Sequence, residues 1–246
     1  MYALLFAEPV VDRTALRLNA RNEVHQSPLI RACATGTESA IIALTQGFWP
    51  FVSAFEKAID TQVGRLPLRP LMHRFGHARI RRFFAEARAA VREMREEEGS
   101  HAALWQEAAA QLGVELAADN QLTNQHMIDG VAALLHNADA DDPVEFFCWL
   151  AGTEYIAEEL AACLCGSPAF LAQFPDNRWA WGEAHMAGHD GPSHLEIDED
   201  LARAYHPATN PQLAGAALTA HIRRCQRLFG LAAQDVMAHA QSAMVR

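Results

Sequence analysis

A glutamate, a histidine and a tryptophan lie at helical spacing in the segment REEEGSHAALW, residues 95–105. Glu98 and His101 are three residues apart and Trp105 follows four residues later, so all three project from one side of a helix. Because Trp105 is a large apolar side chain, this side is expected to face the core. A carboxylate and an imidazole that enter a core together must be satisfied by each other, by a hydrogen-bond network or by a metal ion.

Three further segments each carry two side chains of metal-ligating type, four residues apart. The pairs are Glu154 with Glu158, His185 with His189, and His194 with Asp198. Carboxylates and imidazoles that converge from different helices are the usual ligands of non-heme iron and manganese in helical bundles. The alternatives are charges on a solvated helix face, acids that favour the dipole of a first helical turn, and ordinary loop histidines.

The elements that must position these pairs are helical. Apolar residues recur with helical periodicity and no segment has a convincing strand pattern. The candidate helices cover 37–66, 69–114, 122–138, 143–166, 193–206 and 211–244, the second as one helix or two, while 167–192 is predicted to be a loop-rich segment. No repeat or long linker divides the chain. The sequence predicts one all-α domain over residues 1–246, with about seven or eight helices.

The composition excludes several classes of partner. The net charge of -10 argues against nucleic acid, which requires a basic surface. No stretch of about eighteen residues is free of charged or strongly polar side chains, so a membrane span is not expected. The first residues lack the basic region of a signal peptide. Five cysteines without such a signal predict reduced thiols in the cytoplasm.

The order of the motifs resembles a known group of proteins. Glu-x-x-His, then a glutamate in a central helix, then His-x-x-x-Asp is similar to the heme-oxygenase-like diiron oxidases and oxygenases. This group shares its fold with TenA-type thiaminase II and pyrroloquinoline-quinone synthase. Residues 22–59 resemble its opening helices, EEEGSHAALW its Glu/His/Trp signature and HLEIDEDLA its late motif. The resemblance covers most of the chain and implies a heme-oxygenase-like helical bundle.

The resemblance also implies a metal centre with two irons and dioxygen as cosubstrate. The implied iron ligands are Glu98, His101, Glu158, His194 and Asp198. No other catalytic residue and no organic cofactor site is expected.

Three positions leave this ligand set open. The group has a last histidine where this chain has Leu201, so the second iron is expected to be labile. His185 or His189 are the alternative nitrogen donors. Glu154, one turn before Glu158, is the reserve carboxylate or a partner of the ligands.

The implied activity is the oxidation of a small organic substrate in specialised metabolism. An amino acid, a fatty acid or an aromatic acid fits this expectation, and relatives suggest a homodimer. One alternative is a metal-free enzyme similar to thiaminase II or the quinone synthase, which works by acid–base chemistry. Since TenA-type enzymes use a cysteine nucleophile, Cys148 and Cys163 are the candidates for that role. Another alternative is a catalytically silent member that binds a small molecule.

Overall fold

The computed structural model describes residues 5–6, 8–116, 127–138, 140–186 and 193–244. The described part contains eleven α-helices, one short 3-10 helix and no strand. The elements are α1 (Arg13–Gln26), α2 (Pro28–Ala34), α3 (Glu38–Val63), α4 (Leu68–Phe75), α5 (His77–Gln111), α6 (Asp129–Ala138), α7 (Pro143–Cys165), α8 (Pro168–Leu171), η1 (Pro175–Asn177), α9 (Ala180–Met186), α10 (His194–Tyr205) and α11 (Pro211–Met244).

The all-α prediction is confirmed, but the helix count is higher than the predicted seven or eight. One reason is the region after residue 166, predicted as loop-rich, which contains α8, η1 and α9. Helices of three to seven residues are too short to show a hydrophobic period, so sequence periodicity misses them. Another is Gly76, whose φ of +83° separates α4 from α5. Glycine adopts this conformation without steric cost, which explains a helix boundary inside a periodic segment.

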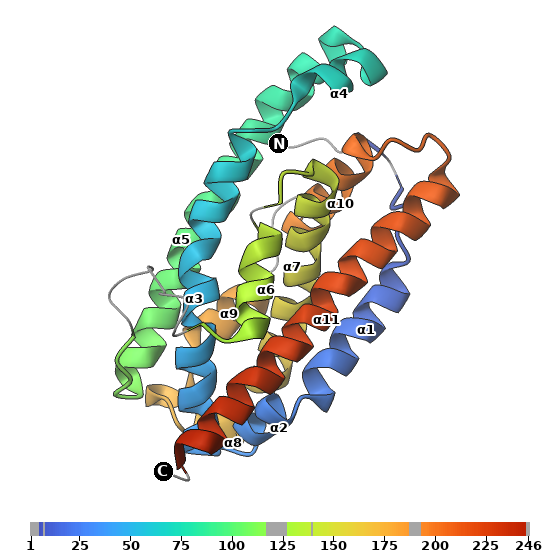
Figure 1. Cartoon of the computed structure of the whole chain (residues 1–246). Coiled ribbons are helices and arrows are strands. Elements are labelled where there is room, and N and C mark those ends of the chain that lie inside the picture. Colours follow the sequence, from blue (N-terminus) through green and yellow to red (C-terminus); the bar gives the residue numbers. More distant parts are fainter. Residues whose placement is uncertain (1–4, 7, 117–126, 139, 187–192, 245–246) are drawn as a thin grey trace.

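The central helix of the bundle is α7, which packs against α1, α6, α9, α10 and α11 (Figure 1). Its start is fixed by the Asp142 carboxylate, which accepts a hydrogen bond from the Val144 amide at 2.8 Å, and by Pro143 in the first turn. Most of its side chains are buried, among them Phe146, Phe147 and Tyr155. On a helix that is buried on several faces, a polar side chain needs a hydrogen-bond partner or an ion.

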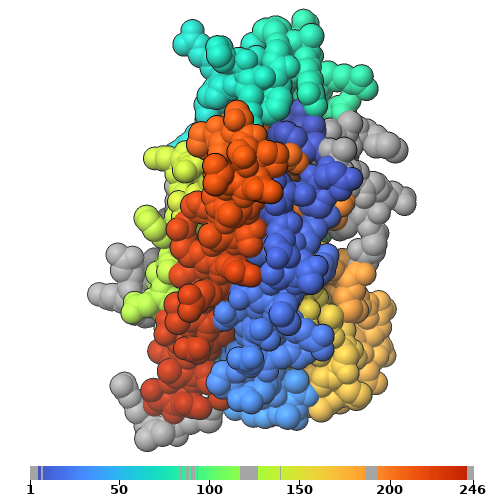
Figure 2. Space-filling model, turned by 90° about the vertical axis from the view of Figure 1, so that its right-hand side faces the viewer, coloured from blue at the N-terminus to red at the C-terminus, as the bar shows by residue number. Residues whose placement is uncertain are grey.

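The other helices surround α7. The antiparallel pair α3 and α5 runs along one side and continues past the bundle, with α4 at its tip (Figure 1). Helices α1 and α11 lie side by side on another face, as Figure 2 shows. α10 begins with a capping box, in which Ser193 and Glu196 each bond the other's backbone amide. No described helix is long and apolar enough to cross a membrane.

Helix α6 packs closely against α11 at Gly130. A Cβ atom at this position would lie 2.4 Å from the Cα of Ala232, which is backbone and cannot yield. Gly130→Ala is therefore expected to lower the free energy of unfolding by about 1–3 kcal/mol. Gly64→Ala is the control, because Gly64 has a helical φ of -63° and its nearest atom would be 3.5 Å away. Urea denaturation should show that variant to be neutral or stabilised by up to about 1 kcal/mol; equal losses in both would contradict the close approach.

Candidate metal centre

Three helices place two carboxylates and one imidazole at one interior point. Glu98 on α5, Glu154 on α7 and His194 on α10 each offer one ligand atom, and these atoms lie within 4.8 Å of one another. We call these three residues the cluster. Glu98 is 8% exposed and His194 9% exposed. Side chains from separate helices that meet in this way are how helical bundles build metal sites.

His101 lies beside Glu98, as their spacing predicts. Its Nδ1 is 3.3 Å from Oε2 of Glu98, and only 14% of the His101 side chain is exposed. Burial lowers the pKa of His101, but the adjacent Glu98 carboxylate outweighs this effect and the net shift is upward. Burial raises the pKa of Glu98, against the opposing effect of His101. On α5, each of these two side chains therefore partly offsets the cost of burying the other's charge.

His194 faces two carboxylates with its two ring nitrogens. Nε2 lies 2.9 Å from Oε2 of Glu97, and Nδ1 lies 3.8 Å from Oε1 of Glu154. Burial lowers the pKa of His194, but Glu154 and Glu97 raise it by more. Burial in turn raises the pKa of Glu154, but His194, His185 and His101 together hold it below its ordinary value. Glu154 is therefore an ionised carboxylate inside the bundle.

Asp198 is the least compensated group of the site. It is 1% exposed, and neither carboxylate oxygen has a hydrogen-bond partner among the described residues. Burial, followed by the charges of Glu154, Glu199 and Glu98, raises the pKa of Asp198 well above its ordinary value. By contrast, the neighbouring Glu199 accepts a hydrogen bond from the Tyr155 hydroxyl at 2.8 Å and pairs with Arg13 at 2.7 Å. A buried carboxylate without partners calls for a ligand, an ion or a proton.

His185 lies against the cluster from α9. Its ring contacts those of His101 and Trp181 in a tilted arrangement, with centroids 4.1 Å and 3.8 Å away. Nδ1 lies 2.8 Å from the Trp181 carbonyl oxygen. Because a carbonyl only accepts, Nδ1 carries the proton and Nε2 keeps its lone pair. Burial and the nearby His101 lower the pKa of His185 to about 4, so the ring is neutral and able to bind a metal.

The two glutamates of α7 have different surroundings. Glu154 belongs to the cluster, whereas the Glu158 carboxylate pairs with Nη1 of Arg17 at 2.8 Å and its side chain is 34% exposed. Both line a cavity of about 420 Å³ together with His101, His185 and His194. Of these two neighbours on one helix face, Glu154 therefore belongs to the interior site and Glu158 forms an ion pair at its rim.

Two further positions bear on the predicted ligand set, His189 and Leu201. His189 lies outside the described residues. Leu201 is 1% exposed and belongs to the apolar core, so α10 offers no nitrogen at that position. Of the two alternative nitrogen donors, His185 is the one in the described residues, and it lines the cavity and contacts His101.

Sequence reasoning missed Glu97, which contacts His194. Its spacing of four residues from His101 was the available signal, but only Glu98 of this acidic run was assigned to the inward side of the helix. It also missed Trp181, whose position on a short helix carried no period.

Neither candidate cysteine nucleophile belongs to the cavity of the cluster. Cys148 is 1% exposed, and burial strongly raises the pKa of its thiol. Burial also raises the pKa of Cys163. Because the thiolate is the nucleophile, both thiols are in poor surroundings for this role.

Comparison with known proteins defines the class of fold. No protein-family model and no curated protein matches the sequence. The structure is similar to the crystal structure of a TenA homolog from Pseudomonas syringae pv. tomato, with a TM-score of 0.69 and 16% sequence identity. The match covers 96% of this chain and 100% of the other. The chain therefore has the heme-oxygenase-like fold of TenA proteins, as the resemblance implied.

Proposed function

We propose that this chain is an iron-dependent oxidase or oxygenase that uses dioxygen to oxidise a small organic substrate. The observation that carries the proposal is the buried meeting of Glu98, Glu154 and His194 from three helices. It is supported by Asp198, whose buried carboxylate has no hydrogen-bond partner among the described residues. A TenA-type fold does not by itself require these side chains to converge. An amino acid, a fatty acid or an aromatic acid is the proposed class of substrate.

The residues present fit a metal ion. Carboxylate oxygens and imidazole nitrogens are the donors that iron and manganese accept. Two buried oxygens of Asp198 lack hydrogen-bond partners among the described residues, and a cation would compensate them. We propose that Glu98, Glu154 and His194 hold the ion, with His101 and Asp198 beside them. Bound iron would supply the electron-transfer chemistry with dioxygen that amino-acid side chains lack.

The chain's own groups would prepare this site. The Trp181 carbonyl holds the Nδ1 proton of His185 and so directs Nε2 away from α9 as a lone pair. Glu97 contacts Nε2 of His194, which fixes the plane of that ring. The Arg17–Glu158 pair at the rim places a compensated charge near the entrance instead of an open carboxylate.

A second candidate function is a metal-free enzyme of the thiaminase II or quinone-synthase kind. Leu201 favours it, because the position that would complete the family's iron ligands is apolar and buried. In that case, His101, His194 and Glu154 would exchange protons with the substrate as acid and base. The surroundings of Cys148 and Cys163 count against the thiaminase form of this candidate.

Metal counting separates the two functions. Protein purified without chelator and loaded anaerobically with ferrous iron is expected to retain one iron per chain after desalting. A second iron should be lost during desalting, because Leu201 supplies no ligand. The loaded protein should then consume dioxygen when a substrate is added. Iron retention no greater than that of a Glu98→Gln/Glu154→Gln variant would overturn the metal proposal and favour the metal-free candidate.

A further inference from the structure

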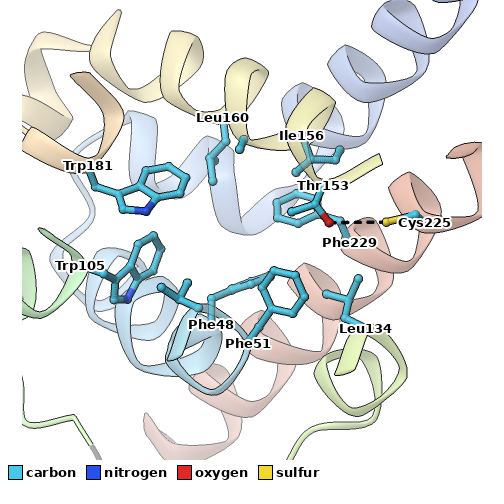
Figure 3. Close-up of a pocket in the computed structure, with 12 residues that line it drawn as sticks. Phe48, Phe51, Trp105, Leu134, Thr153, Ile156, Leu160, Trp181, Cys225 and Phe229 are labelled. Carbon is cyan, nitrogen blue, oxygen red and sulfur yellow. Dashed lines mark hydrogen bonds between the residues drawn. The ribbon is translucent and has the colours of Figure 1, made fainter. Parts of the chain in front are cut away.

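A second cavity lies beside the metal centre. It encloses about 490 Å³ of empty space, including its opening, between α3, α5, α6, α7, α9 and α11. Figure 3 shows Trp105 and Trp181 facing each other at one end and Thr153 beside Cys225 at the other. Phenylalanine and aliphatic side chains form most of the remaining wall. We call this cavity the apolar pocket.

Three polar groups on the wall of the apolar pocket already have hydrogen-bond partners. The Thr153 hydroxyl and the Cys225 thiol both donate to the Trp149 carbonyl oxygen, at 3.0 Å and 3.4 Å. The Trp105 indole N–H donates to the Thr45 carbonyl oxygen at 2.9 Å. A polar or charged occupant would lose its hydration without finding these groups as partners. Ordered water is also disfavoured, since it needs two to four polar partners.

The apolar pocket and the metal centre share the helices α5, α7 and α9, on which their residues lie about one turn apart. On α5, His101 points to the cluster and Trp105 lines the pocket. On α9, His185 lines the cavity of the cluster and Trp181 lines the apolar pocket. Their ring centroids are 3.8 Å apart. On α7, Ala157 lines the pocket and lies three residues after Glu154. The rings of Trp181 and His185, which are in contact, thus lie between the two cavities.

We propose that the apolar pocket binds the hydrocarbon chain of an aliphatic carboxylic acid, which is the substrate, and that the acid's polar end reaches the cluster. The part of this inference that concerns the polar end rests on the proposed iron centre. The part that concerns the chain rests on the apolar pocket alone. An amino acid with a polar side chain, or another short polar acid, has no group that would fill such a pocket.

The test measures binding to full-length, chelator-treated protein by calorimetry, with straight-chain alcohols from hexanol to dodecanol and the matching carboxylates below their micelle concentrations. Affinity for the alcohols should rise about fourfold per added methylene until the pocket is full. The carboxylates should bind more weakly to this metal-free protein, because Glu98 and Glu154 repel them. Loading with ferrous iron should restore carboxylate binding by at least tenfold.

Two variants place the ligand. Ala157→Leu adds three carbon atoms on the wall of the apolar pocket and should weaken alcohol binding at least tenfold, while the helix-forming character of α7 is kept. Ala162→Leu is the same substitution on the exposed side of α7 and should leave binding unchanged. Val52→Phe fills the pocket from α3 and provides an independent check if Ala157→Leu impairs folding.

The outcomes separate the inference from the proposed function. Alcohol binding that ignores chain length, or that survives both filling substitutions, would overturn the assignment of the apolar pocket. Chain-dependent alcohol binding supports that assignment whether or not iron binds. If carboxylates gain nothing from iron that metal counting shows to be bound, the pocket assignment and the iron centre stand, and the acid as substrate is contradicted.

Discussion

Glu154→Gln is expected to abolish iron retention, whereas Glu158→Gln, one turn further along α7, should leave it intact. Glu154 contributes a carboxylate oxygen to the group in which all ligand atoms lie within 4.8 Å. Glutamine keeps the size of the side chain but loses the negative charge. Affinity for ferrous iron should fall on the order of a hundredfold or more, since changes to groups that only support ligands already cost ten- to a hundredfold.

The Glu158→Gln control matches this variant in chemistry, helix and distance from the cavity. Its carboxylate is engaged by Arg17 at 2.8 Å, so its loss removes an ion pair at the rim. Such a half-exposed pair contributes about 0–1 kcal/mol to stability. Both variants would be loaded anaerobically and desalted, and their iron measured by mass spectrometry. If Glu158→Gln loses the iron and Glu154→Gln keeps it, the assignment of the α7 ligand is reversed.

Asp198→Asn is expected to change metal binding and the stability of the metal-free protein in opposite directions. Burial raises the pKa of Asp198 above its value in the unfolded chain. The ionised form is thus disfavoured in the folded state. The metal-free protein should lose stability as the pH rises above the unfolded pKa of Asp198, and this loss should continue up to the higher folded pKa. Asparagine cannot ionise, so this pH dependence should disappear.

At neutral pH without metal, Asp198→Asn should therefore stabilise the protein by about 1–3 kcal/mol, as judged by urea denaturation in the presence of chelator. With ferrous iron, the same variant should retain at least tenfold less metal, since a carboxylate that compensates the ion is lost. A loss of stability in the metal-free variant would show that Asp198 has a partner in the folded protein and would contradict the assignment of its two free oxygens.

Asp200→Asn is the matched control on α10. Asp200 is also buried, but its two oxygens accept hydrogen bonds from the Leu5 and Phe6 amides at 2.8 Å and 3.0 Å. Asparagine keeps one acceptor and loses the other, so this variant should be destabilised by about 1–3 kcal/mol. Its iron content should not change. The two variants thus distinguish a carboxylate that stabilises the fold from one that is proposed to compensate a metal ion.

The sequence alone determined the all-α class and the features of the site that lie within single helices. Periodicity without strand patterns predicted the all-α fold, and the motif order indicated the heme-oxygenase-like group. Three-residue spacing placed Glu98 beside His101, where the structure has them 3.3 Å apart. The start of α7 at Pro143 was also readable, because capping residues act within one turn. These features depend on neighbours in the chain.

Only the tertiary structure decided between Glu154 and Glu158 as the residue that joins the cluster. Positions four apart on a helix differ by only about 40° around its axis, so their spacing puts both on one face. The rotation of α7 against α5 and α10 turns Glu154 inward, and Arg17 on α1 engages Glu158. The contact of Glu97 with His194 and the contact of the His185 ring with the His101 ring likewise join separate helices. Helical periodicity fixes directions within one helix, whereas packing decides which of them meet.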